Sequence, residues 1–156
     1  MIIANNLKKS FGPQSIFEGV SFLINPGERV GLVGKNGTGK STLFKMILGQ
    51  ENPDSGTLST PKGYQIGALK QIIRFTQPTV LKECIEALNP EKQWDHYRAE
   101  IILSGLGFSE QDFHKNPTSF SGGYQVRINL CKVLLANPNM LLLDEPTNYL
   151  DILSLR

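Results

Sequence analysis

The chain has 156 residues, 40% of them hydrophobic and 19% charged, which is enough to bury the core of one domain and excludes a disordered chain. Its 16 basic and 14 acidic residues are interleaved, so the net charge of +2 provides no basic tail or stripe for nucleic acid. Two cysteines, no signal-peptide stretch and no apolar run near the roughly 18 residues of a membrane span predict a soluble, cytoplasmic chain without direct membrane insertion.

The first part of the chain is rich in strand patterns. Short apolar or alternating runs predict three strands, at residues 2–7, 16–24 and 29–33, with an Asn-Pro-Gly turn between the last two. From Gly39 onward the apolar residues recur at helical spacing instead. These helical positions are Leu43, Met46 and Ile47.

After that helix the pattern returns to strands and then becomes helical again. Two short strands are predicted at 56–59 and 64–69, and residues 79–116 are helical with two apolar stripes. The stripes are Val80, Leu81, Cys84, Ile85 and Leu88, followed by Tyr97, Ile101, Ile102 and Leu106. With a final helix and strand, this order predicts an α/β sheet with a small helical subdomain at about 75–120.

Residues 34–41 match the phosphate-loop pattern G-x-x-x-x-G-K-[ST], the Walker A motif, between an apolar strand pattern and a helical one. Glycines let the backbone amides curl around phosphate oxygens, Lys40 reaches the β- and γ-phosphates, and Ser41 holds Mg²⁺. The positive end of the following helix points at the same anion. A plain glycine turn is the alternative. The predicted nucleotide contacts are Gly34, Asn36, Gly37, Thr38, Gly39, Lys40, Ser41 and Thr42.

A fully apolar run at 140–143 ends in Asp144 and Glu145, which predicts a buried strand that delivers two carboxylates to the edge of the sheet. Asp144 is expected to bind Mg²⁺, and Glu145 to polarise the attacking water. On its own, an acidic pair after a strand is equally well explained by a solvated loop. Beside a phosphate loop, the pair indicates a Mg-nucleotide site.

Ser121, Gly122 and Gly123 open the helix predicted at 122–135. A serine at the N-cap followed by two glycines leaves the first amides of the helix open to an anion. Simple capping of the helix is the alternative explanation.

Taken together and in this order, the motifs resemble the ATP-binding cassette (ABC) ATPase domain over essentially the whole chain. They are the phosphate loop, Gln71, Ser121-Gly122-Gly123 and Leu143-Asp144-Glu145-Pro146-Thr147. The resemblance implies a P-loop NTPase core sheet with an antiparallel β edge and a small helical subdomain, within one domain at 1–156. It also implies binding and hydrolysis of ATP with Mg²⁺.

The resemblance implies further roles for single residues. Phe11 occupies the place of the aromatic residue that stacks on adenine, where the family more often has tyrosine; a core phenylalanine is the alternative. Gln71 corresponds to the glutamine that contacts Mg²⁺ and the water, or is a solvated glutamine. Ser121–Gly123 resembles the signature sequence that contacts ATP held by the opposing cassette, although Tyr124 departs from the transporter-like glutamine. Asp151 corresponds to an aspartate at the dimer interface, or caps a helix.

Two stretches, at 122–130 and 145–151, resemble the ABC-F subfamily, whose members are soluble tandem ATPases that in many cases act on the ribosome. Tyr149 departs from the histidine usual at its place. The predicted partners are therefore a second cassette and the ribosome. The ATP-binding subunit of a membrane transporter, docked on transmembrane partners, is the alternative. A binding-only module that has lost hydrolysis is the third possibility.

The chain ends at Arg156, before the strand that carries the switch histidine in this family. We therefore expect it to be the first cassette of a longer protein, incomplete at its C-terminus. Residues 1–156 alone are expected to bind Mg-ATP weakly and to hydrolyse it poorly.

Overall fold

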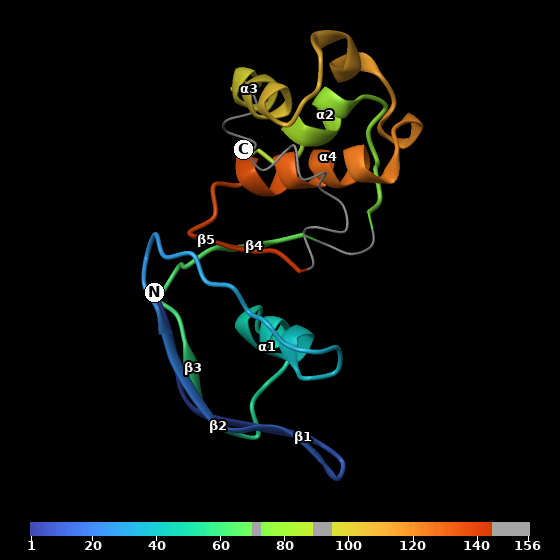
Figure 1. Cartoon of the computed structure of the whole chain (residues 1–156). Helices are drawn as coiled ribbons and strands as arrows, with labels where there is room; N and C mark the ends of the chain where they lie inside the picture. The colour runs from blue at the N-terminus through green and yellow to red at the C-terminus, as the bar shows by residue number, and fades with distance from the viewer. Residues whose placement is uncertain (70–72, 89–94, 145–156) are drawn as a thin grey trace. The chain divides into compact units, whose positions relative to one another are not determined.

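The computed structural model describes residues 1–69, 73–88 and 95–144. The chain divides into two compact units, Met1–Ile66 and Gly67–Arg156 (Figure 1). Three of the predicted site residues, Gln71, Glu145 and Asp151, lie outside the described residues.

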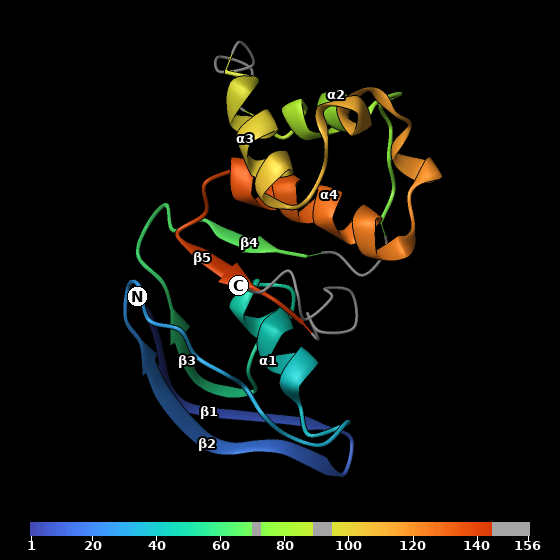
Figure 2. The same cartoon turned by 45° about the horizontal axis from the view of Figure 1, so that its top comes forward.

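The first unit is a three-stranded antiparallel sheet with one helix. β1 (Ile2–Phe11) pairs with β2 (Gln14–Ile24) on one edge and with β3 (Ser55–Ser59) on the other, in the order β2-β1-β3. α1 (Lys40–Ile47) lies on the concave side of this curved sheet (Figures 1 and 2). The buried apolar residues of the first unit are Ile2, Ala4 and Leu7 of β1 and Leu43, Met46 and Ile47 of α1. The helical spacing predicted for Leu43, Met46 and Ile47 is therefore confirmed.

β1 runs well beyond the predicted end at residue 7. Its second half is polar and mostly exposed, and the strand pairs there with β2 from Lys8 opposite Glu18 to Phe11 opposite Gln14. Backbone pairing across the hairpin, rather than burial, extends the strand. A prediction that follows apolar residues therefore ends it too early.

The strand predicted at 29–33 is wrong. The structure assigns no strand there, and Val30, Leu32 and Val33 are 61%, 45% and 95% exposed. An apolar run predicts a preference for burial, but a strand also needs a neighbour that pairs its amides and carbonyls. No described strand pairs with this segment.

The second unit is mainly helical, and α2 and α3 pack on α4 (Figure 2). Its elements are β4 (Ile66–Ala68, which begins at the last residue of the first unit), α2 (Val80–Ile85), α3 (Tyr97–Gly105), the short 3-10 helices η2 (Glu110–His114) and η3 (Pro117–Ser119), α4 (Gly122–Leu135) and β5 (Met140–Leu142). β4 and β5 form a two-stranded sheet. None of the described helices is long and apolar enough to cross a membrane.

The apolar core of the second unit confirms the first predicted stripe and half of the second, since Ile102 and Leu106 pack against it. Its buried residues are Val80, Cys84, Leu88, Ala99, Leu103, Phe108, Phe113, Ile128, Cys131 and Leu135. In α3, however, Tyr97 and Ile101 are 54% and 64% exposed, and Ala99 and Leu103 face the core instead. Both pairs are four residues apart, so helical spacing alone does not decide which face is buried.

Both cysteines are free and buried in this core. A hydrogen bond with the Cys131 thiol, together with burial, raises the pKa of the Cys84 thiol. A thiol in such surroundings stays protonated and unreactive, so the two cysteines act as small apolar core residues.

Candidate functional site

The phosphate loop leads into α1 at Gly39, the N-cap residue of the helix. Gly39 has a φ of 100°, in the left-handed region where a side chain is strained. A Cβ at this position would also overlap Cγ2 of Ile16 on β2. Glycine is therefore required both by the backbone angle and by the space, and it allows the start of α1 to lie against β2.

The Lys40 ammonium group folds back over the phosphate loop. Its Nζ donates hydrogen bonds to the carbonyl oxygens of Gly34 at 2.6 Å and Lys35 at 2.9 Å. The Thr38 hydroxyl donates to the Lys35 carbonyl at 2.8 Å. These bonds keep the loop curled and hold a positive charge within it.

A hollow of about 310 Å³ opens beside this loop. It is lined by Phe17, Leu32, Val33, Gly34, Thr38, Gly39, Lys40 and Leu43. The first turn of α1 contains no acidic residue, and the amides of Lys40, Ser41 and Thr42 precede the first intrahelical bond, which runs from the Leu43 amide to the Gly39 carbonyl. The loop and helix start therefore offer a cation and backbone donors to an anion.

Phe11, at the end of β1, is 49% exposed and is not a core residue. The Lys9 ammonium lies 5.2 Å from the centroid of its ring. Lys9 is held by the Glu51 carboxylate at 2.7 Å and by Asp54 at 3.2 Å. The hydrogen bond to Glu51 raises the pKa of Lys9 against the opposing effect of burial. The contact between Lys9 and Phe11 was not predicted from the sequence, although residues two apart on a strand lie on the same face of the sheet.

Ser121 is the N-cap residue of α4 and is exposed, but its side chain makes no capping hydrogen bond. The first intrahelical bond runs from the Gln125 amide to the Ser121 carbonyl at 2.9 Å. The alternative of simple side-chain capping is therefore wrong. The amides of Gly122, Gly123 and Tyr124 precede that first bond, as an anion contact requires.

Asp144 lies two residues after the end of β5, with Leu143 between them, and is half-buried. The strand before it is less buried than predicted, since only Leu142 is fully buried and its neighbours are half-buried. Two paired strands leave more of an apolar run uncovered than a wide sheet does. Among the described residues, no group of three or more His, Cys, Asp or Glu side chains is arranged to hold a metal ion.

A buried ion pair joins α2 to α4 in the second unit. The Glu83 carboxylate is fully buried, pairs with the Lys132 ammonium, and accepts from the amides of Thr76 and Gln77 at 2.8 Å each. Burial alone raises the pKa of Glu83, but the hydrogen bonds from Lys132, Gln77 and Thr76 outweigh it and lower the pKa. Sequence analysis missed this network; an acidic residue within an apolar stripe was the available indication.

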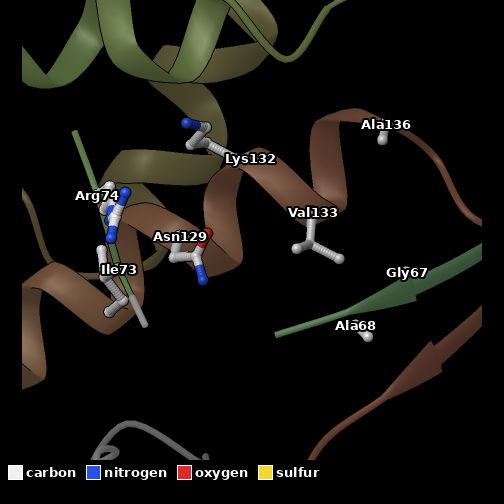
Figure 3. A pocket seen from close by; sticks show the side chains of 8 residues that line it. All are labelled: Gly67, Ala68, Ile73, Arg74, Asn129, Lys132, Val133 and Ala136. Carbon is white, nitrogen blue, oxygen red and sulfur yellow. The ribbon is translucent and has the colours of Figure 1, made fainter. Parts of the chain in front are cut away.

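A second hollow, of about 550 Å³, lies between β4 and α4 (Figure 3). It is lined by Gly67, Ala68, Ile73, Arg74, Asn129, Lys132, Val133 and Ala136. The strand approaches the helix closely at Gly67, where a Cβ would lie 2.6 Å from Cγ1 of Val133. None of the predicted site residues lines this hollow.

The predicted site residues thus fall into separate groups. The phosphate-loop residues come together within the first unit, which also carries Phe11. Ser121–Gly123 and Asp144 belong to the second unit. The remaining three predicted residues lie outside the described parts of the chain.

The sequence of this chain is similar to a known family and to several named proteins. The ABC transporter family matches residues 17–148. The energy-dependent translational throttle protein EttA of Escherichia coli (strain K12) is 39% identical over 155 residues, 97% of this chain and 28% of that protein. The protein named "Probable ATP-binding protein YheS" of Haemophilus influenzae is 34% identical over 182 residues, again 97% of this chain and 28% of the relative. The chain therefore spans less than a third of the length of these relatives.

Solved structures are similar over nearly the whole chain. The ATP-binding subunit of an ABC transporter has a TM-score of 0.81 at 25% identity, covering 99% of this chain and 70% of that one. The bacterial ABC transporter cassette MJ0796, solved as a dimer, has a TM-score of 0.78 at 24% identity, covering 99% of this chain and 78% of that one. The same cassette has been solved in a post-hydrolysis state with ADP and Pi, with a TM-score of 0.76.

Proposed function

The chain belongs to the ABC transporter family, and from this premise we propose that it binds and hydrolyses ATP as one cassette of a protein that acts on the ribosome. One observation carries the proposal: the phosphate loop is curled around the Lys40 ammonium, at the open start of α1. We further propose that residues 1–156 form one ATP-binding domain, with a helical subdomain at about 75–120.

In this proposal the triphosphate of ATP enters the phosphate loop. Lys40 exchanges the carbonyls of Gly34 and Lys35 for oxygens of the β- and γ-phosphates. The amides at the start of α1 donate to the same anion. Phe11 offers its exposed ring to the adenine by stacking.

We propose that Mg²⁺ is held by the Ser41 hydroxyl, Asp144 and Gln71. Oxygen ligands of this kind suit a hard cation, and Mg²⁺ usually takes only one or two carboxylates besides substrate phosphates. When bound, Mg²⁺ neutralises charge on the phosphates during transfer. Glu145 accepts a proton from the attacking water and orients it.

The Ser121-Gly122-Gly123 tripeptide acts on the nucleotide of a second cassette in this proposal. The exposed serine hydroxyl and the amides at the start of α4 suit a phosphate oxygen. Asp151 would lie at the interface between the two cassettes. That MJ0796 has been solved as a dimer supports a pairing of two cassettes. Closing the pair on ATP and opening it after hydrolysis would make the protein a switch.

The ribosome is the proposed target because EttA is named a translational throttle protein and is 39% identical to this chain. A ribosome-linked role places the protein in the cytoplasm. The ATP-binding subunit of a membrane transporter is the second candidate. It is supported by the description of the matching family and by the solved transporter subunit with a TM-score of 0.81.

Co-sedimentation of the full-length protein with ribosomes separates these two functions. The Glu145→Gln variant, which should bind ATP without hydrolysing it, is expected to pellet with ribosomes in ATP and to stay in the supernatant without nucleotide. Lys40→Ala is the matched control, because it should lose ATP binding and with it the ATP-dependent pelleting. Recovery of Glu145→Gln with membranes, and not with ribosomes, would contradict the ribosome proposal and favour the transporter.

A further inference from the structure

The Ser121-Gly122-Gly123 tripeptide is flanked by two aromatic residues, since Phe120 directly precedes it and Tyr124 directly follows it. Both aromatic side chains are half-buried, whereas Ser121 and Gly122 are exposed. The chain therefore turns inward on either side of the tripeptide and outward at the tripeptide itself.

Phe108, Phe120 and Tyr124 form an aromatic cluster in which every ring contacts the other two. The centroids of Phe108 and Tyr124 are 5.2 Å apart with planes at 88°, and those of Phe108 and Phe120 are 5.5 Å apart at 64°. Phe120 and Tyr124 are 5.9 Å apart and tilted by 32°. Edge-to-face pairs at such distances are favoured because the positive ring edge meets the negative ring face. Phe108, only 4% exposed, anchors the cluster in the apolar core.

Arg127, nearly one turn along α4, fixes the tyrosine ring further. Its guanidinium carbon lies 4.7 Å from the Tyr124 centroid, and its Nη1 donates to the Leu106 carbonyl at 3.2 Å. Arg127 is only 8% exposed, so the cation is held against the ring with little competition from water. A second link is the Gln125 side-chain amide, which donates to the Phe120 carbonyl at 2.8 Å.

We propose that Phe120 and Tyr124 are positioning residues that hold the tripeptide in its binding geometry before a nucleotide arrives. Glycine loses more conformational freedom than any other residue when it is fixed, so two glycines in succession are poorly ordered unless their neighbours are anchored. The aromatic cluster anchors both neighbours in advance, and binding then requires less ordering. The inference rests on the proposed function of the tripeptide. It assigns a role to Tyr124, whose ring the glutamine common at this place in the family could not supply.

The test compares Tyr124→Leu with Tyr124→Phe in the full-length protein. The leucine removes the ring, and the phenylalanine keeps it and removes only the hydroxyl. Exchange of the Gln125 amide, which bonds to the Ser121 carbonyl, reports opening of the first turn of α4 without nucleotide. Tyr124→Leu is expected to speed this exchange about tenfold, because local opening becomes easier. Tyr124→Phe should exchange like the wild type.

Activity gives the second readout. In Tyr124→Leu the kcat for ATP should fall about tenfold or more, since small misplacements of a positioned group are costly. The Kd for a fluorescent ATP analogue, measured in the same protein, should change less than about twofold, because the phosphate loop is untouched. Tyr124→Phe should restore kcat. A merely structural defect would lower nucleotide binding as well.

The inference would be overturned if Tyr124→Leu had the same Gln125 amide exchange rate and the same kcat as the wild type. It would also be overturned if Tyr124→Leu and Tyr124→Phe lost kcat equally. Should Tyr124→Leu fail to fold by circular dichroism, Phe120→Leu, which leaves the contact between Arg127 and Tyr124 in place, decides in the same way. If the wild type shows no hydrolysis that depends on Glu145, the proposed function fails. The amide exchange of Gln125 still decides separately whether the aromatic cluster orders the tripeptide.

Discussion

The two glycine-containing motifs of this chain are built in different ways. The phosphate loop is shaped by residues within it, through the left-handed Gly39 and the hydrogen bonds from the Lys40 ammonium to carbonyls five and six residues earlier. The Ser-Gly-Gly tripeptide is instead held through its two aromatic neighbours by groups distant in sequence, the Phe108 ring and the Leu106 carbonyl, which lie more than ten residues before it. One motif is defined by local chemistry and the other by tertiary packing.

This difference has a physical consequence for substitution. A change within the phosphate loop should affect that loop and leave the rest of its unit folded. A change in the contacts that hold α4 should affect both the stability of the second unit and the tripeptide at the start of the helix.

Glu83→Ala should be the most disruptive substitution. It leaves the Lys132 ammonium and the amides of Thr76 and Gln77 without their acceptor in a buried place, and breaking such a pair costs about 3–5 kcal/mol in the free energy of unfolding. Chemical denaturation of the full-length protein measures this loss. Glu86→Ala, at an exposed position directly after α2, removes one hydrogen bond from the Thr76 hydroxyl; it is the control and should change stability by no more than about 1 kcal/mol. Equal effects of the two would show that the buried pair does not hold α2 to α4.

Lys40→Ala should remove the cation within the phosphate loop without unfolding its unit. We expect ATP hydrolysis by the full-length protein to fall about 10²-fold or more, comparable to the loss of one donor to a developing negative charge. Lys35→Ala is the matched control, because its side chain is exposed and only its carbonyl is used in the loop. Hydrolysis that survives Lys40→Ala would exclude the phosphate loop as the site of reaction.

Two glycines within the loop allow a finer comparison. Gly39→Ala combines a left-handed φ of 100° with a clash against Ile16, whereas Gly37→Ala meets the strain of a φ of 83° in open space. We expect Gly39→Ala to lower the free energy of unfolding by about 2 kcal/mol or more, and Gly37→Ala by about 1 kcal/mol. Thermal denaturation of the two variants side by side checks the order. A larger loss in Gly37→Ala would mean that space does not matter at Gly39.

The smallest effect is expected in acid. Hydrogen bonds from the Lys115 ammonium and from the hydroxyl and amide of Ser109 lower the pKa of Asp112 to about 2. A carboxyl whose pKa is lower in the folded state stabilises it above the unfolded pKa of about 3.9 and loses this contribution as the pH falls toward 2. Asp112→Asn should therefore flatten the decline in stability between about pH 4 and 2, which acid titration followed by circular dichroism measures. If the stability of Asp112→Asn declined between about pH 4 and 2 as steeply as that of the wild type, Asp112 would not contribute to acid stability as proposed.

The sequence carried enough information for the family, the fold class and the position of most helices. The prediction of an ABC cassette is confirmed by the family match, and the predicted α/β fold class by the similar structures. The helix at 122–135 was predicted with its bounds, because a glycine start and an apolar period are local features. The roles of the individual site residues remain predictions.

Features that depend on distant partners could not be predicted. Val30–Val33 has the composition of a strand, but no described strand pairs with it. Tyr97 and Ile101 have helical spacing, yet packing of α3 turned them outward. Glu83 and Tyr124 gain their surroundings only when α2, α3 and α4 come together. Spacing describes one element at a time, whereas these contacts arise between elements.

The most direct test of the central proposal is steady-state hydrolysis of ATP by the full-length protein, with and without Glu145→Gln. We predict that the wild type turns over ATP in the presence of Mg²⁺. We also predict that Glu145→Gln lowers kcat about 10²-fold or more and leaves the affinity for a fluorescent ATP analogue unchanged. Equal turnover by the two proteins would contradict the proposal that this chain carries an ATP-hydrolysing cassette.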